Sequence, residues 1–398
     1  MAKVYDTATD LITFARLQSQ NTTSGSSYLG SDGLLKFAAE DEPRIEYGSD
    51  GSLKGLLIEE QRTNLLTSSE DFSSWNTGNV GSLSVGGEAP DGTASATTVK
   101  ASESGGSGNT AINLSTTLTA DTTYTFSVYA KSGTLNFVSL SNLSYTTGTG
   151  TSWFDLSTPD VALENANHTA TIEDVGKQWY RLSITFATTT DTTGNLWLTF
   201  NESASFSTPQ NGASVTHIWG AQLEAGSFAT SYIPTSGSQQ TRSADVASIP
   251  VSAFGYNQDA GTVVVEFDLV GFSPDGPTGY PRVWEFDQAN NDYIAVLSDL
   301  LGKAALRENE SNVEAKYDAA LTQDISAVMA SAFADDDLAT SLDGATTLTA
   351  TPSYTLDLPT ALAIGSAVGG GRYLNGHIKS LKYYPRRLTD AQLQELTA

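Results

Sequence analysis

The sequence Tyr-Thr-Phe-Ser-Val-Tyr-Ala-Lys, residues 124–131, alternates its side chains between an apolar and a more polar face. A β-strand places successive side chains on opposite faces, so a period of two predicts a strand with one buried face. Residues 178–186, 195–200 and 261–269 carry the same pattern. Ser, Thr and Gly are frequent and Leu-rich amphipathic runs are scarce, which favours short strands joined by turns. We therefore predict an all-β protein built from β-sandwiches.

The predicted strands divide the chain into three parts. Residues 1–65 are predicted to form an extended N-terminal segment that packs on a neighbour or attaches the protein to a partner. Residues 66–240 and 245–398 are predicted to form two β-sandwich domains. The Ser/Thr-rich stretch 234–243 is nearly free of apolar residues, which is typical of a linker.

Turn and cap residues mark the ends of several predicted elements. Asp-Gly pairs at residues 32–33 and 50–51 supply the positive φ that tight hairpin turns need. Near the C-terminus, Thr389 and Gln392 have the spacing of a helix capping box. We therefore predict one short C-terminal helix.

Charge and composition exclude several classes of protein. The 398 residues carry 20 Lys and Arg against 45 Asp and Glu, a net charge of −25, which repels nucleic acid and anionic membranes. The absence of cysteine excludes disulfides and thiolate metal sites. The N-terminus has no apolar signal segment, and no run approaches the ~18 apolar residues of a membrane span. We expect a chain made in the cytoplasm without membrane insertion.

Three motifs carry a resemblance to a known family. They are Gly-Leu-Leu-Ile-Glu-Glu-Gln-Arg-Thr-Asn-Leu-Leu at 55–66, Trp-Gly-Ala-Gln-Leu-Glu-Ala-Gly at 219–226, and Tyr-Leu-Asn-Gly-His-Ile at 373–378. With Trp75, 89–93 and 179–181, the first two resemble carbohydrate-binding modules of bacteriophage head-spike fibres and tail fibres. The C-terminal half is similar to concanavalin A-like, laminin-G-type jelly-roll domains, through 342–344, 364–365, 374–378 and 383–393. The resemblance covers most of the chain, but its motifs are mainly scaffold residues and do not transfer a ligand.

Sugar binding requires aromatic faces for stacking and polar groups for the hydroxyls. Tyr129, Trp179 and Trp197, with Arg181 beside them, lie on the more polar side of predicted strands and would form one patch if those strands are neighbours. The alternative is that these rings pack in a core, or that the N-terminal segment or another subunit covers the face. In the second domain, Trp284 is the candidate.

The spacing of the acidic residues bears on catalysis and metal binding. Glu266 with Asp268 matches part of the Glu-X-Asp-X-X-Glu strand of jelly-roll glucanases, but the third position is Gly271. Glu285 with Asp287 also lacks the third acidic residue of this motif, so we expect no enzymatic activity. Residues 335–337 are three aspartates that could bind a structural calcium, although a charged turn is the alternative. We expect no other cofactor.

These observations lead to three hypotheses. The first is a non-catalytic adhesin on the virion surface that binds host cell-surface polysaccharide. The resemblance implies attachment to other virion proteins through the N-terminal segment, and a homo-oligomer of the kind that is often trimeric. The second is a capsid decoration protein whose lectin-like folds bind no ligand. The third is a polysaccharide depolymerase, against which the missing carboxylates argue.

Overall fold

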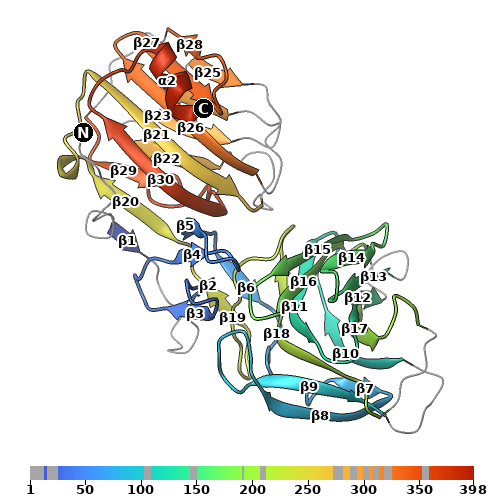
Figure 1. The fold of residues 1–398 in the computed structure, drawn as a ribbon. Coiled ribbons are helices and arrows are strands. Elements are labelled where there is room, and N and C mark those ends of the chain that lie inside the picture. The colour runs from blue at the N-terminus through green and yellow to red at the C-terminus, as the bar shows by residue number, and fades with distance from the viewer. Residues whose placement is uncertain are drawn as a thin grey trace.

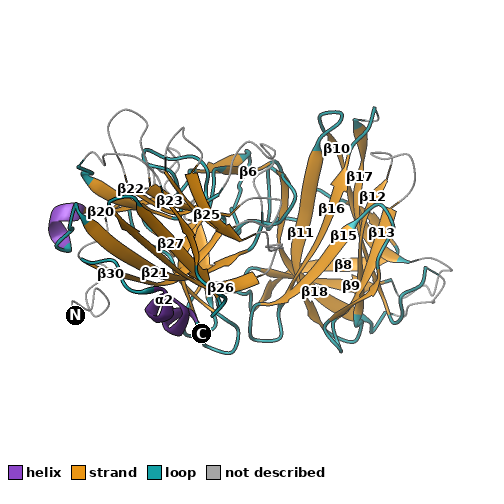
Figure 2. Cartoon of the chain, turned by 90° about the horizontal axis from the view of Figure 1, so that it is seen from above, coloured by secondary structure: helices purple, strands orange, loops and turns teal. Residues whose placement is uncertain are grey.

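The computed structural model of this chain forms two β-sandwiches, with N-terminal strands lying between them (Figure 1). Among the described residues the helices are η1 (Val251–Ala253) and α2 (Asp390–Thr397), and strands make up the rest of the regular structure (Figure 2). The all-β prediction is therefore confirmed. The structure describes residues 13–15, 26–102, 109–143, 150–190, 192–206, 212–271, 281–286, 294–298, 304–308, 313–317, 325–351 and 358–398.

The first sandwich packs two six-stranded antiparallel sheets face to face. The sheet that we call the β17 sheet runs β14 (Asp160–Leu163), β13 (Gly150–Asp155), β12 (Phe137–Leu143), β17 (Thr193–Asn201), β10 (Thr110–Thr117) and β7 (Asn76–Gly78). The β11 sheet runs β15 (Thr169–Asp174), β16 (Tyr180–Ala187), β11 (Thr123–Ser132), β18 (Val215–Ala225), β9 (Ala96–Ala101) and β8 (Val80–Gly87). The apolar faces of the predicted strands meet in the core, where Phe126, Leu182 and Leu198 are fully buried.

The second sandwich packs two seven-stranded sheets. The β21 sheet runs β28 (Leu348–Ala350), β27 (Asp337–Leu342), β26 (Ile325–Ala334), β21 (Ala260–Leu269), β30 (Gly376–Tyr384), β5 (Leu53–Ile58) and β4 (Ile45–Tyr47). The β22 sheet runs β1 (Thr13–Ala15), β20 (Val246–Pro250), β29 (Ala361–Ile364), β22 (Arg282–Phe286), β23 (Ile294–Ser298), β24 (Ala304–Glu308) and β25 (Val313–Tyr317). Val263, Val265 and Phe267 face the core, as the alternation predicts.

The C-terminal helix α2 covers the outer face of the β21 sheet. The side chain of Thr389 accepts from the main chain of Gln392, and the side chain of Gln392 accepts from the main chain of Thr389, so the predicted capping box is present. Leu388 and Leu393 pack with Val264 on this face. None of the helices among the described residues has the length and apolar character needed to cross a membrane.

The described residues of the N-terminal segment, 13–15 and 26–65, lie inside the architecture rather than ahead of it. Strands β1, β4 and β5 join the sheets of the second sandwich, and β5 pairs with β30 through Gly376 and Ile58. Leu56 and Ile58 are apolar and pack into the core of the second sandwich. The pairing of β5 with β30 also supplies hydrogen-bonding partners to what would otherwise be an open sheet edge. The pairing of this N-terminal segment with strands of the C-terminal domain could not be predicted from local sequence patterns.

The rest of this segment forms two short ribbons between the sandwiches. Strands β2 (Ser26–Leu29) and β3 (Leu35–Ala38) make a hairpin, and the turn places Gly33 of the predicted Asp-Gly pair at φ 71°. Strand β6 (Arg62–Asn64) pairs with β19 (Gln240–Arg242). The predicted linker 234–243 is therefore partly fixed by main-chain hydrogen bonds.

A buried ionic cluster joins these segments. The fully buried Arg44 donates from Nη1 to Glu59 Oε2 and to Ser231 Oγ, each at 2.7 Å. Its Nη2 donates to Asp245, which also accepts from the main-chain N–H of Glu59 at 2.9 Å. Arg242 Nη2 lies 3.5 Å from Glu59 Oε2. Burial opposes ionisation of Glu59, but the guanidinium groups of Arg242 and Arg44 outweigh it and hold its pKa well below the usual range.

A second part of the cluster extends from β6 into β18. Arg62 Nη2 lies 2.5 Å from Glu60 Oε1, and its Nε lies 3.9 Å from the fully buried Glu224. The side chain of Asn64 accepts from the main chain of Leu223 at 3.2 Å. We call Arg44, Glu59, Glu60, Arg62, Glu224, Arg242 and Asp245 together the junction network.

We predict that Glu59→Gln strongly destabilises the protein, because it leaves two buried guanidinium groups without their shared carboxylate. Breaking a buried ion pair in this way costs about 3–5 kcal/mol, which urea unfolding of the purified chain would measure. Asp32→Asn is the control, since Asp32 pairs with Lys36 at 3.0 Å where both side chains are over 40% exposed. That change should leave the unfolding midpoint nearly unchanged, because exposed ion pairs contribute little to stability. Equal losses in the two variants would contradict the importance of the junction network.

Candidate functional site

The structure separates the aromatic residues that the sequence suggested as one sugar-binding patch. Trp197 lies on β17, which pairs with β10 and β12. Tyr129 and Arg181 lie on β11 and β16, which pair with each other in the opposite sheet. Trp179 directly precedes β16. The patch is not formed, because the strands concerned belong to the two different layers of the sandwich.

On the outer face of the β11 sheet, the aromatic rings are covered. Tyr129 and Trp179 are 2% and 1% exposed and pack with Trp219, Tyr232 and Leu35. Leu35 comes from β3, so the N-terminal hairpin covers this face, as one reading of the sequence allowed. These buried rings offer no face for a sugar.

The two remaining candidates are also buried. Trp284 is 0% exposed and lies in the core of the second sandwich. Arg181 donates from Nη1 to the main-chain oxygen of Thr230 at 2.6 Å and from Nη2 to Ser127 Oγ at 3.1 Å. Its guanidinium lies over the ring of Tyr129, 5.4 Å from the centroid.

Trp197 is the candidate aromatic that faces a hollow. It is half-buried on the outer face of the β17 sheet, where the hollow has a volume of about 350 Å³. Its strand neighbours are Ser141 on β12 and Asn113 on β10. The hollow is lined by Gly78, Asn109, Ala111, Ser141, Leu143, Thr151, Trp197, Thr199 and Phe206. We call this the Trp197 hollow.

Phe206 is a second aromatic at the Trp197 hollow and was missed by the sequence analysis. Its side chain is 51% exposed and meets the buried Trp153 edge to face at 5.2 Å. The signal was present, since residues 201–206 place one large aromatic in a polar turn directly after β17. Together with Trp197, it gives the hollow two accessible aromatic rings.

The chemistry of the Trp197 hollow is aromatic and uncharged. Two aromatic rings stand beside hydroxyl and amide groups, and Ser141 and Thr151 are 2.9 Å apart between their side-chain oxygens. None of the nine lining residues is ionisable in the physiological range. Such a surface can stack on the C–H face of a sugar ring and exchange hydrogen bonds with its hydroxyls.

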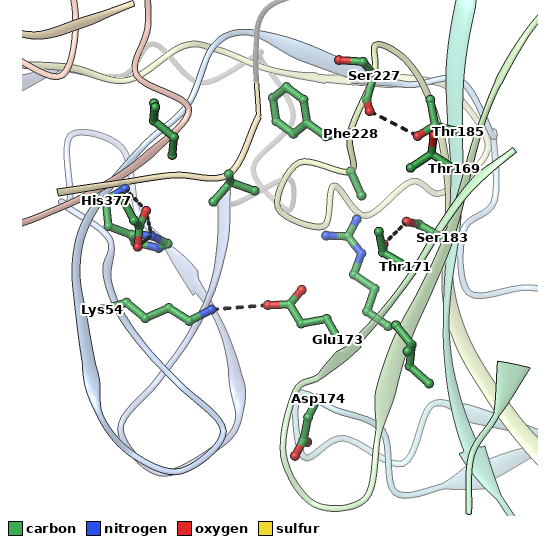
Figure 3. A pocket seen from close by; sticks show the side chains of 16 residues that line it. Lys54, Thr169, Thr171, Glu173, Asp174, Ser183, Thr185, Ser227, Phe228 and His377 are labelled. Atoms are coloured by element: carbon green, nitrogen blue, oxygen red, sulfur yellow. Dashed lines mark hydrogen bonds and ion pairs between the residues drawn. The ribbon is translucent and has the colours of Figure 1, made fainter. Parts of the chain in front are cut away.

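A larger hollow lies between the two sandwiches, and we call it the inter-sandwich cleft (Figure 3). Its volume is about 560 Å³. Strands β15 and β16 supply one wall, including Thr171 and Ser183, and Lys54 and His377 of the second sandwich lie on the opposite side (Figure 3). Lys54 Nζ reaches Glu173 Oε1 across the cleft at 3.3 Å.

His377 connects three strands at the edge of this cleft. Its Nε2 lies 2.7 Å from Glu46 Oε2, and its Nδ1 lies 2.8 Å from Asp268 Oδ1. Burial opposes protonation of the imidazole, but the hydrogen bonds to Asp268 and Glu46 outweigh it and raise the pKa of His377 to about 9. At neutral pH it is therefore a buried cation between two carboxylates.

The carboxylates tested for catalysis have structural partners. Glu266 pairs with Lys379 at 2.6 Å, Glu285 pairs with Arg282 at 2.6 Å, and Asp268 holds His377. Asp287 lies outside the described residues.

At the candidate calcium site, residues 335–337, one of the three aspartates has a cationic partner. Asp337 pairs with Arg387 at 3.0 Å. Within the described part of the chain, no three His, Asp or Glu side chains gather as metal ligands.

Comparison with known proteins gives distant likenesses. No family model and no curated protein matches the chain. Similar solved structures include domains LG4-5 of the mouse laminin alpha1 chain, at 10% identity over 72% of this chain and 89% of that one, with a TM-score of 0.28. The tandem CBM22 domains of Paenibacillus barcinonensis Xyn10C have 10% identity over 77% and 99%, and a TM-score of 0.28. A Trypanosoma rangeli sialidase has 12% identity over 76% and 60%, and a TM-score of 0.27. At these values the likeness assigns neither a family nor a ligand.

We predict that His377 makes stability fall as pH rises. Its pKa is raised from about 6.5 in the unfolded chain to about 9 in the fold. The stabilisation it contributes is therefore complete below pH ~6.5 and is lost as pH rises through about 9. Urea unfolding from pH 6 to 9.5 should show a decline on the order of 2–3 kcal/mol.

His377→Gln should remove most of that decline. His217→Gln is the control, because burial lowers the pKa of His217, the opposite direction to the shift of His377. An unchanged pH profile in His377→Gln would show that another group is responsible.

Proposed function

We propose that this protein is a non-catalytic glycan-binding protein of a bacteriophage virion surface, an adhesin that holds host polysaccharide at the Trp197 hollow. The observation that carries the proposal is the half-buried Trp197 and exposed Phe206 beside hydroxyl and amide side chains, with no charge in the lining. The motifs that resemble phage fibre modules support the virion location.

The chemistry of the hollow favours neutral sugars. An indole ring stacks on the C–H face of a pyranose, and hydroxyl groups both donate and accept, as sugar hydroxyls require. The net charge of −25 repels polyanionic polymers over a longer range. A single shallow site gives modest affinity, so binding to a cell would rely on many copies on one particle.

The same lining supports binding without cleavage. Glycoside hydrolysis needs two carboxyl groups that flank the scissile bond. The nine residues of the Trp197 hollow include neither Asp nor Glu. A bound saccharide would therefore be retained rather than hydrolysed there.

Attachment to other virion proteins through the N-terminal segment is part of this proposal. Residues 26–64 of the N-terminal segment are largely engaged within the chain, through β2 to β6 and the junction network. Attachment through these residues would therefore use side chains that the intrachain contacts leave exposed, and we propose the homo-oligomer that the resemblance implies together with it.

We predict that Trp197→Ala weakens glycan binding about 10-fold or more, because loss of a stacked ring removes on the order of 1.5 kcal/mol. A printed array of host-surface and reference oligosaccharides would identify ligands, and calorimetry would measure affinity. Phe206→Ala should reduce affinity in the same direction. Leu163→Ala is the control, since Leu163 is 52% exposed on β14 of the same sheet and lies outside the hollow.

Equal affinity in Trp197→Ala and Leu163→Ala would contradict the site. A wild-type chain that binds no saccharide and no host cell would favour the decoration protein. Release of reducing sugar from host polysaccharide would favour the depolymerase.

A further inference from the structure

We infer that the inter-sandwich cleft is a second saccharide-binding site, which takes a short neutral oligosaccharide segment independently of the Trp197 hollow. The choice of saccharide as the ligand class rests on the proposed function. The existence of a site rests on the cleft itself, which holds about 560 Å³ between the two sandwiches.

One wall of the cleft is a ladder of polar side chains. The outward residues of β15 and β16 face each other directly across the strands, as Thr169 with Thr185 and Thr171 with Ser183. Thr171 Oγ1 and Ser183 Oγ are 2.6 Å apart (Figure 3). Successive outward residues of a strand are about 6.7 Å apart, so the wall offers hydroxyls at regular intervals to a chain molecule lying along it.

Arg181 supplies a donor that the fold does not use. It lines the cleft and is 7% exposed, and its Nη1 and Nη2 are satisfied by Thr230 and Ser127. Its Nε is buried and has no hydrogen-bond partner among the described residues. A buried donor without a partner is unfavourable. Because this Nε is fully buried, an oxygen of a bound ligand would satisfy it only after the guanidinium shifts toward the cleft.

The charges around the cleft cancel and favour a neutral ligand. Lys54 pairs with Glu173, and the protonated His377 is held by Asp268. The ionisable lining residues are Lys54, Arg181 and His377 against Glu173, Asp174 and Asp268. A carboxylate or phosphate would meet as many negative groups as positive ones. A hydroxyl-rich neutral ligand can use both kinds, since its hydroxyls donate and accept.

The two walls belong to different sandwiches, so a ligand in the cleft would contact both. The Lys54–Glu173 pair crosses the opening, and its side chains are 34% and 54% exposed. Exposed pairs of this kind contribute little to stability, so sugar hydroxyls can replace the contact. Phe228 also lines the cleft, and Gly271 of the second sandwich lies close to its ring.

The test uses the full-length chain and the double variant Thr171→Val with Ser183→Ala. This change removes both hydroxyls of one rung together and leaves neither without its partner. The matched control is Thr117→Val with Thr193→Val, a cross-strand hydroxyl pair 3.4 Å apart on the β17 sheet that lines neither hollow. The probes are printed neutral oligosaccharides of three to six sugars, with uronate-containing analogues, followed by calorimetry.

We expect the Thr171/Ser183 variant to bind at least one class of neutral oligosaccharide ~10-fold more weakly, and the control variant and Trp197→Ala to retain that binding. If Trp197→Ala abolishes all saccharide binding and the Thr171/Ser183 variant binds normally, the cleft is not a site. If the reverse holds, the Trp197 hollow fails as the site of the proposed function and the cleft stands. A chain that binds no saccharide overturns both.

A second measurement does not depend on altering the polar wall. The chain has no cysteine, so Lys54→Cys introduces a single thiol at the mouth of the cleft. A saturating neutral oligosaccharide should slow maleimide labelling of this thiol several-fold, also when Trp197→Ala is present. Labelling at an unchanged rate would overturn the inference.

Discussion

The carboxylate of Glu59 is buried against the guanidinium groups of Arg44 and Arg242, and the arrangement of the whole molecule depends on this contact. A buried charge is stable only when ionic and hydrogen-bonding partners replace water around it. Here the partners of the carboxylate are Arg44, which precedes β4, Ser231 at the end of the first sandwich, and Arg242 on β19. Satisfying one charge therefore fixes three distant segments, and through β5 and β20 it fixes the second sandwich as well.

This requirement explains why the motif at 55–66 is so distinctive. It contributes Glu59, Glu60 and Arg62 to the junction network, and Glu224, the partner of Arg62, lies in the other prominent motif, 219–226. Each of these side chains needs a partner of defined charge and geometry, which few other residue types can supply. The most recognisable residues are thus those that hold the two sandwiches together, and they leave the ligand undetermined.

The junction also decides which surfaces remain open. The N-terminal hairpin covers the outer face of the β11 sheet and buries Trp179 and Tyr129, whereas the outer face of the β17 sheet keeps Trp197 and Phe206 accessible. The inter-sandwich cleft lies where the edge of the β11 sheet approaches the second sandwich. One hollow is aromatic and uncharged, and the other is polar with balanced charges, so the two surfaces suit different parts or kinds of glycan.

The sequence by itself determined the elements whose signals are local. Alternation in residues 124–131 and 261–269 predicted the core faces correctly, and the Thr389 capping box predicted α2, because such patterns depend on neighbours a few residues away. Of the aromatic candidates, however, the sequence could not separate Trp197 from Trp179, since both follow the same alternation. Only the tertiary structure decided which sheet each belongs to, what covers it, and that β4 and β5 complete the second sandwich. Those outcomes depend on strand pairing and burial between residues up to hundreds of positions apart, which no local pattern encodes.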